Sequence, residues 1–192
     1  MELPAIYVID FEGNTRYGVI EFGVVTVAGG EIADIVSEAC QVGNAEAFSI
    51  LGHTRFTDHG ALPFSAHLAF FSKLRRTGYF CAHHASTEDR LLRRYAPCPV
   101  YLDDSNKDKS VTSWGPWIDT LLLYKRNFPE FQKHSVKDLI NIVGLEDELA
   151  KYSQEDETFH RARHDAIATA LLLKYFISRF RISSIEFLLV TK

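Results

Sequence analysis

Runs of apolar residues divide the N-terminal part of the chain into three candidate strands. Residues 5–12 form an apolar run that ends in two carboxylates, the pattern of a strand buried on both faces. Residues 17–27 are rich in Val, Ile and Phe, and residues 31–42 carry alternating apolar positions. The pair Gly29-Gly30 between these two segments predicts a hairpin turn. We therefore expect antiparallel strands at the start of the chain.

Helical periodicity begins at Pro63 and alternates with short strands from there on. Gly78 ends the first helical segment, and Ser135 opens a later one with a capping-box pattern to Asp138. Gly144 follows the end of that later helix. The pattern predicts helices at 63–77, 86–95, 117–127, 135–143 and 161–180, and short buried strands at 79–82 and 100–102.

Three segments have weaker patterns. Residues 43–62 predict a short helix and a loop, and residues 103–113 predict a mobile loop because they are polar without an apolar period. Residues 181–192 are compatible with a strand or a short helix. The order of strands first and α/β units afterwards predicts an α/β fold, a mixed sheet flanked by helices. Neither a repeat nor a linker divides residues 1–192, so we expect a single domain.

Composition narrows the function classes. The 192 residues are 46% hydrophobic and 24% charged, typical of a globular protein. No apolar run reaches the ~20 residues that span a bilayer, and no signal-peptide layout is present, so we expect a cytoplasmic protein without membrane contact. Three scattered cysteines predict reduced thiols. A net charge of −4 excludes a globally basic polynucleotide binder, so any nucleic acid would be contacted locally.

The two carboxylates at the end of the first strand are the first chemical signal. Asp10 and Glu12 project from the same face of the strand, roughly 7 Å apart. Ionised groups held this way repel each other unless a cation lies between them. A divalent cation would resolve the repulsion. The alternative is a pair of ordinary carboxylates that point into water before the Gly13-Asn14 turn.

Two further motifs accompany Asp10-Phe11-Glu12. They are the segment 83–89 at a strand-to-helix junction and the segment 160–166 at the start of the last helix. With Val19-Ile20-Glu21-Phe22-Gly23, Asp119-Thr120-Leu121 and His134-Ser135-Val136, the chain resembles the DEDDh 3'→5' exonuclease family. This is the proofreading-subunit and ribonuclease T-like branch of the ribonuclease H-like fold. The resemblance covers nearly the whole chain.

The resemblance implies a two-metal hydrolysis of phosphodiester bonds, with Mg²⁺ or Mn²⁺ as the two divalent cations. Asp10, Glu12 and Asp165 would hold the first cation, and Asp10 would share the second. His160 would act as the general base. Five residues separate His160 from Asp165, so we expect His160 on the loop before the helix and Asp165 in its first turns. Arg161 stands where a sister group has Tyr, which favours the His type.

The implied partner is a nucleic acid with a free 3' end, and a single strand is favoured. DNA and RNA remain equal alternatives, and relatives of the ribonuclease T type leave a homodimer open. Phe11 and His53 could contact the terminal nucleotide by stacking and polar contacts, or could simply pack. The competing function is a catalytically degenerate member that acts as a nucleic-acid or protein interaction module. The presence of Asp10, Glu12, His160 and Asp165 argues against it.

The second motif departs from the family pattern of His-Asn-Ala-x-Phe-Asp. His84 replaces Asn, Thr87 replaces Phe, and Glu88 stands at the Asp position. The apolar pair Leu91-Leu92 fits the family register only if Glu88 is the catalytic acid. Asp89 is the alternative acid.

Residues around this motif have structural interpretations. A capping pair of Ser86 with Asp89 would give Asp89 a structural role at the helix start. His83 is interpreted as a hydrogen-bonded core residue. His164 is interpreted as a surface or supporting residue.

Overall fold

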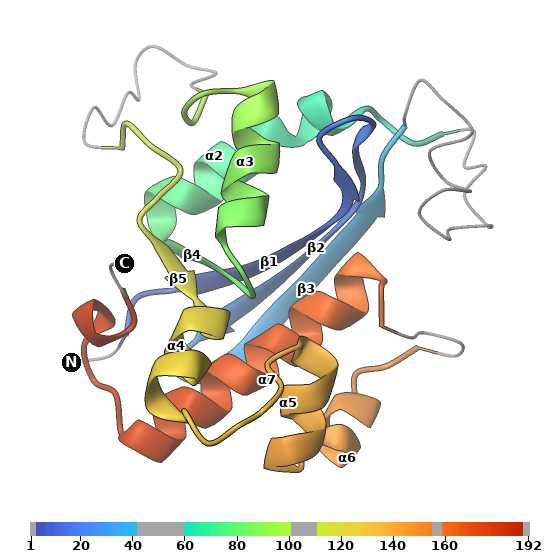
Figure 1. The fold of residues 1–192 in the computed structure, drawn as a ribbon. Helices are drawn as coiled ribbons and strands as arrows, with labels where there is room; N and C mark the ends of the chain where they lie inside the picture. The colour runs from blue at the N-terminus through green and yellow to red at the C-terminus, as the bar shows by residue number, and fades with distance from the viewer. Residues whose placement is uncertain (1–2, 42–59, 101–110, 155–158, 190–192) are drawn as a thin grey trace.

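The computed structural model describes residues 3–41, 60–100, 111–154 and 159–189. These residues build one five-stranded sheet with helices on both faces, as the ribbon in Figure 1 shows. The strand order is β3-β2-β1-β4-β5. The first three strands pair antiparallel, whereas β4 runs parallel to β1 and β5 parallel to β4. The bounds are β1 (Ile6–Asn14), β2 (Gly18–Ala28), β3 (Glu31–Ala39), β4 (Tyr79–Ala82) and β5 (Trp117–Asp119).

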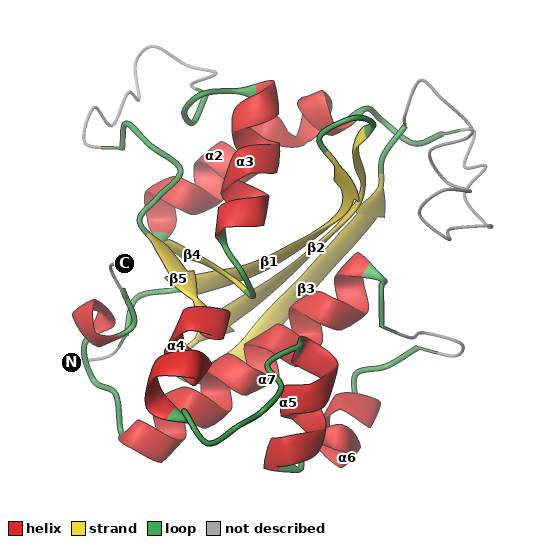
Figure 2. Cartoon of the chain, in the orientation of Figure 1, coloured by secondary structure: helices red, strands yellow, loops and turns green. Residues whose placement is uncertain are grey.

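Helices cover both faces of this sheet (Figure 2). The long helix α7 (Ala162–Phe180) lies across β1, β2 and β3, and three shorter helices surround it. These are α4 (Thr120–Asn127), α5 (Val136–Val143) and α6 (Glu146–Ala150). The opposite face carries η1 (Phe64–His67), α2 (Leu68–Thr77) and α3 (Ser86–Tyr95). A 3₁₀ turn, η3 (Ile185–Phe187), follows α7 near the chain end.

Alternation along β1 divides its side chains between two cores. Ile6 and Val8 belong to the core formed with α7. Tyr7, Ile9 and Phe11 belong to the core beneath α2 and α3. Asp10 and Glu12 continue the face of Ile6 and Val8, because side chains two residues apart share a face. Both carboxylates therefore lie on the α7 side of the strand.

The contact between β2 and the start of α7 is close because Gly23 has no side chain. A Cβ at this position would lie 2.3 Å from the carbonyl oxygen of Ala162. Small residues continue the contact along the helix, where Ala162, Ala166 and Ala170 are fully buried. Gly23 is the direct partner of Asp10 in the β1–β2 register. The first turn of α7 is thus held beside Asp10.

The predicted α/β class, a mixed sheet flanked by helices in a single domain, is confirmed. The hairpin turn at Gly29-Gly30 joins β2 to β3 as predicted, and β3 ends at Ala39. Ser135 caps α5, and Gly144 ends that helix in the left-handed conformation. The helix predicted from 161 begins at Ala162.

The helix predicted for 117–127 is wrong at its start. Residues Trp117–Asp119 form β5 and pair with β4, and the helix begins only at Thr120. Asp119 accepts a hydrogen bond from the amide of Leu122, so this residue marks the helix boundary as an N-cap. Apolar spacing across 117–127 concealed the break, because a three-residue strand is too short to show its own period.

Other sequence predictions have mixed outcomes. Val100 lies outside the strands, with its amide donating to the hydroxyl of Ser72, and the remainder of the predicted strand 100–102 lies outside the described residues. So do residues 43–59 and most of the predicted loop 103–113. Helix α6 was not predicted. Within the described ranges, no helix combines the length and the apolar character needed to cross a membrane.

The Gly23 contact gives a direct stability test. Gly23→Ala should lower the free energy of unfolding by about 3 kcal/mol, because backbone atoms of α7 must move to admit the Cβ. Gly30→Ala is the control, since nothing lies within 4 Å of its added Cβ and only its positive φ is unfavourable. That control should cost about 1 kcal/mol. Urea unfolding measures both, and equal losses would contradict the packing argument.

Candidate active site

The end of β1 presents carboxylates where the sheet has a gap. Strand β4 pairs with β1 only along Ile6–Val8, so Asp10 lies beyond the last paired residue on that side. On the other side Asp10 and Glu12 lie opposite Gly23 and Glu21 of β2. The gap lets side chains from α3 and α7 approach the same place.

The start of α7 supplies the next two groups. Asp165 lies in the first turn of α7, and its Oδ2 accepts a hydrogen bond from the amide of His160 at 3.1 Å. His160 stands before the helix with a positive φ of 72°. Glu12, His160 and Asp165 each present one potential ligand atom within 4.8 Å of the others. The predicted division between a loop histidine and a helix carboxylate is therefore what the structure shows.

Asp10 lies at the centre of the acidic cluster. Burial raises the pKa of its carboxyl well above the ordinary value, and the charges of Asp165, Glu88, Glu12 and Glu21 raise it further. Asp10 is not among the three residues whose ligand atoms converge within 4.8 Å. Its carboxyl is nevertheless close enough to these four carboxylates for their charges to raise its pKa.

Glu88 enters the cluster from the first turn of α3. Its side chain is buried, and its Oε2 has no hydrogen-bond partner among the described residues. Burial raises the pKa of Glu88 to about 8, with further increments from the charges of Asp119 and Glu12 and an opposing hydrogen bond to its own amide. A buried carboxylate oxygen without a partner is costly. This position therefore suits a proton or a cation.

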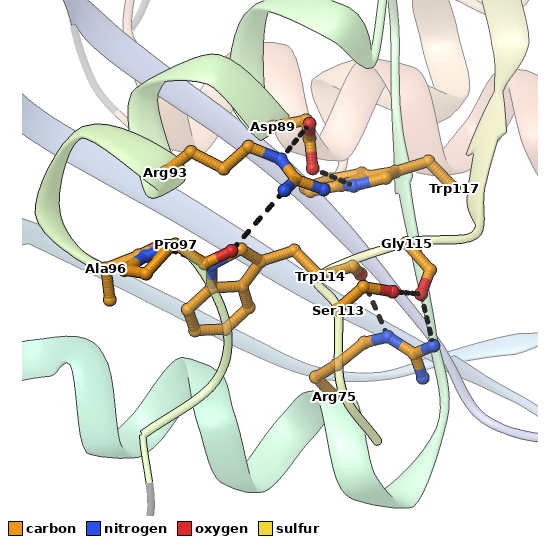
Figure 3. A network of polar contacts seen from close by, with 9 residues as sticks. All are labelled: Arg75, Asp89, Arg93, Ala96, Pro97, Ser113, Trp114, Gly115 and Trp117. Carbon is orange, nitrogen blue, oxygen red and sulfur yellow. Dashed lines mark hydrogen bonds and ion pairs between the residues drawn. The ribbon is translucent and has the colours of Figure 1, made fainter. Parts of the chain in front are cut away.

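Asp89 is engaged by Arg93 and Trp117, as Figure 3 shows. Its Oδ1 accepts from the indole of Trp117 at 3.0 Å, and its Oδ2 accepts from Nε of Arg93 at 2.6 Å. Arg93 in turn donates to the carbonyl of Pro97. Asp89 thus ties α3 to β5.

The predicted capping pair of Ser86 with Asp89 is wrong. The N-cap of α3 is Ala85, and its side chain accepts no capping hydrogen bond. The acceptor for this loop comes instead from β5, because Asp119 accepts from the amides of His84 and Ala85 at 3.2 and 3.0 Å. A distant carboxylate thus replaces the local cap.

Two histidines, His83 and His164, are held by contacts within the fold. His83 contacts the hydroxyl of Thr120 at 2.9 Å and the carbonyl of His134 at 2.7 Å, and burial lowers its pKa. The hydrogen bonds expected of His83 are confirmed, and its side chain is half-buried. His164 is buried against the ring of Phe159, so a surface position for it is wrong.

The structure does not place Phe11 with the carboxylates. Phe11 lies on the opposite face of β1, buried edge-to-face against Phe64 and Phe71 at centroid distances of 5.2 and 5.4 Å. Its position is that of a packing residue, and stacking on a substrate is not supported. His53 lies outside the described residues.

Sequence reasoning missed the roles of Glu21 and Asp119. Glu21 is buried in β2 and pairs with Arg161, and Asp119 supports the loop that presents Glu88. Each left a signal. A lone Glu in an apolar strand requires a buried partner, and Asp-Thr before an apolar run is typical of a helix start.

Comparison with known proteins gives structural relatives only. No protein-family model matches the sequence, and no curated protein matches it either. Solved structures do match with probability 1.00. Exonuclease X in complex with 5' overhanging duplex DNA has a TM-score of 0.65 at 22% identity, covering 93% of this chain and 94% of that one.

Two further structures extend the comparison. A 3'-exonuclease that recognises the histone mRNA stem-loop has a TM-score of 0.64 at 16% identity, covering 93% of this chain and 84% of its own. Pop2p of S. pombe, in its Mg²⁺- and Mn²⁺-bound form, has a TM-score of 0.57 at 13% identity, with 92% and 84% covered. The chain therefore shares the fold of these solved structures, a ribonuclease H-like α/β fold, as the resemblance implied.

The burial of Glu88 predicts a pH-dependent stability. A carboxyl that binds its proton more tightly when folded favours the folded state only while protonated. With its pKa raised to about 8, Glu88 should destabilise the metal-free protein progressively as pH rises from its ordinary range to 8. Glu88→Gln should therefore melt near wild type at pH 5 and be more stable at pH 8.5, by on the order of a few kcal/mol. Thermal unfolding in excess chelator measures this.

The control for this experiment is Asp89→Asn, which changes the adjacent carboxylate outside the cluster. It should lose stability at both pH values, because it weakens the contacts with Arg93 and Trp117. If the stability of Glu88→Gln relative to wild type does not increase between pH 5 and pH 8.5, the ionised Glu88 carboxylate does not destabilise the folded protein.

Proposed function

We propose that this chain is a metal-dependent 3'→5' exonuclease that hydrolyses phosphodiester bonds at the 3' end of DNA or RNA. The observation that carries the proposal is the convergence of Glu12, His160 and Asp165 within 4.8 Å, beside the half-buried Asp10 and the buried Glu88. The shared fold adds support, because its solved neighbours include an exonuclease in complex with duplex DNA and a 3'-exonuclease that recognises an mRNA stem-loop.

The residues present fit hard divalent cations such as Mg²⁺ or Mn²⁺. The donors are carboxylate oxygens, which these cations prefer, and Glu88 offers a buried oxygen without a hydrogen-bond partner in the described part of the chain. Asp10, Glu12 and Asp165 would hold the first cation, and Asp10 would share a second. Bound cations would neutralise the phosphate and stabilise the attacking and leaving oxygens. The neighbour Pop2p was solved with both Mg²⁺ and Mn²⁺.

His160 is proposed as the general base. Its imidazole is exposed beside Glu12 and Asp165, where an attacking water could lie within reach. The water oxygen attacks phosphorus, its proton passes to an imidazole nitrogen, and the 3'-oxygen of the preceding nucleotide leaves. The amide of His160 donates to Asp165, which couples the position of the base to that of a proposed ligand.

The substrate is proposed to be a single strand with a free 3'-hydroxyl. The acidic cluster lies at a strand end open toward α3 and α7, and a net charge of −4 favours local contact with one strand end over wide contact with a duplex. Local binding of one strand end by cations suits this charge. A homodimer and a cytoplasmic location remain predictions from the sequence.

The direct test uses matched 5'-labelled DNA and RNA strands with Mg²⁺ or Mn²⁺, resolved by length. The expected result is a ladder that shortens one nucleotide at a time from the 3' end. Asp10→Asn and excess chelator should each abolish cleavage, and His160→Ala should lose most of the rate. A circular strand should resist, because it has no 3' end.

Cleavage of the circular strand would mean an endonuclease, and activity in excess chelator would contradict metal dependence. Binding of the labelled strand without any cleavage would favour the non-catalytic interaction module. A folded Asp10→Asn protein, verified by circular dichroism, keeps these outcomes separate from a loss of structure.

The second motif can be decided by rate. Glu88→Gln should lower kcat by about 100-fold or more, because only Glu88 among the two adjacent acids faces the cluster. Asp89→Asn should leave kcat near wild type while lowering the melting temperature, because Asp89 serves Arg93 and Trp117. Steady-state cleavage at 25 °C measures kcat of both variants, and thermal unfolding measures their melting temperatures. Loss of kcat in Asp89→Asn with a fully active Glu88→Gln would reverse the assignment.

A further inference from the structure

An ion pair between the buried Glu21 and the partly exposed Arg161 lies beside the candidate active site, without a role in the steps above. Glu21 lies in the first half of β2, and its side chain is 5% exposed between apolar neighbours. Arg161 approaches it with two nitrogens. Its Nε donates to Oε2 of Glu21 at 3.0 Å, and its Nη2 donates to Oε1 at 3.3 Å. This forked geometry fixes the plane of the guanidinium as well as its distance.

The location of the pair links two parts of the site. Glu21 is the direct partner of Glu12 in the β1–β2 register. Arg161 directly follows His160 and flanks the first residue of α7. The ion pair therefore joins the strand position beside Glu12 to the peptide that connects His160 with the helix of Asp165.

The backbone at this connection needs such an anchor. His160 has a φ of 72°, which is unfavourable for a residue with a side chain, and Arg161 returns to an extended conformation. Conformations of this kind persist where the surrounding contacts hold them. The amide of His160 donates to Asp165. Arg161, the next residue, is held to β2 by its side chain, which donates to Glu21.

We infer that the Glu21–Arg161 ion pair positions His160 and the first turn of α7 against Glu12. Both are positioning residues, because neither is required to touch the reacting atoms. The inference rests on the proposed exonuclease function. It goes beyond that function, since neither residue is a proposed ligand or base.

A plain stabilising role is the alternative, since the pair also joins α7 to the sheet. The two roles separate in a double variant. Arg161→Met leaves the buried Glu21 carboxylate without this guanidinium, whereas replacing both by neutral groups of similar size restores much of the stability. Glu21→Gln with Arg161→Met also removes one negative and one positive charge, so the net charge beside the site is unchanged.

The experiment compares Arg161→Met, Glu21→Gln and the double variant. Arg161→Met alone should lower the melting temperature, and the double variant should regain most of it. The kcat on a single strand should stay about 10- to 100-fold below wild type in the double variant, with KM changed little. Mg²⁺ affinity from calorimetric titration should also remain lower, and that readout does not require activity. Arg161→Lys, which keeps the charge without the fork, should recover kcat only in part.

The control is the second ion pair that joins α7 to the sheet. Lys174 donates to Glu31 at 2.6 Å, far along the helix from Asp165. Lys174→Met with Glu31→Gln should leave kcat and Mg²⁺ affinity unchanged. Recovery of kcat and Mg²⁺ affinity together with melting temperature in the Glu21/Arg161 double variant would overturn the inference. If the wild-type protein cleaves nothing, the proposed function fails, and the Mg²⁺ titration alone decides the inference.

Discussion

The close approach of α7 to β2 at Gly23 determines where the acidic cluster forms. A helix laid on a sheet is normally kept at a distance by the side chains between them, and Gly23 removes that layer at one point. Asp10 is the cross-strand partner of Gly23, so the carboxylate on β1 meets the first turn of the helix there. Asp165 then lies beside Asp10 and Glu12 as a consequence of backbone packing. The site would not assemble from the same side chains on a sheet that held α7 a few ångströms further away.

Electrostatic repulsion opposes this packing. Asp10 and the four carboxylates that raise its pKa are drawn together by hydrophobic burial on both faces of the sheet. The fold contains partial remedies. Arg161 neutralises Glu21, and the amide of His160 donates to Asp165. Asp10 and Glu88 instead have raised pKa values, so the remaining repulsion is resolved by protons or by bound cations.

The sequence predicted the fold well where local and long-range signals agree. The hairpin at Gly29-Gly30 and the α5 caps at Ser135 and Gly144 depend on neighbouring residues, and they are confirmed. The strand β5 was missed because three residues carry no period, and its position depends on pairing with β4. The sequence left Phe11 open between a substrate contact and simple packing, and the alternation of β1 directs it to the aromatic core. The support of the loop before α3 could not be predicted, because its acceptor, Asp119, lies over thirty residues away.

Among the candidate site residues, too, local features were predicted and long-range contacts were missed. Spacing was enough to separate His160 on a loop from Asp165 in a helix, and register was enough to favour Glu88 over Asp89. The contacts that give Asp89 its structural position, with Trp117 and Arg93, come partly from β5. The ion pair of Glu21 with Arg161 joins residues 140 positions apart. When two interacting residues lie far apart in the sequence, each position shows only one of the two partners, so the contact itself cannot be predicted.

The second motif bears on whether the site is catalytic or degenerate. Glu88 is buried, its Oε2 lacks a hydrogen-bond partner among the described residues, and its pKa is raised to about 8. An interaction module has no use for such a group, because glutamine of nearly equal size would remove the repulsion and stabilise the fold. A cation-dependent hydrolase does need it, since a carboxylate that is unfavourable without a cation becomes favourable with one. The strain at Glu88 is therefore an argument for catalysis, and it is independent of the resemblance in fold.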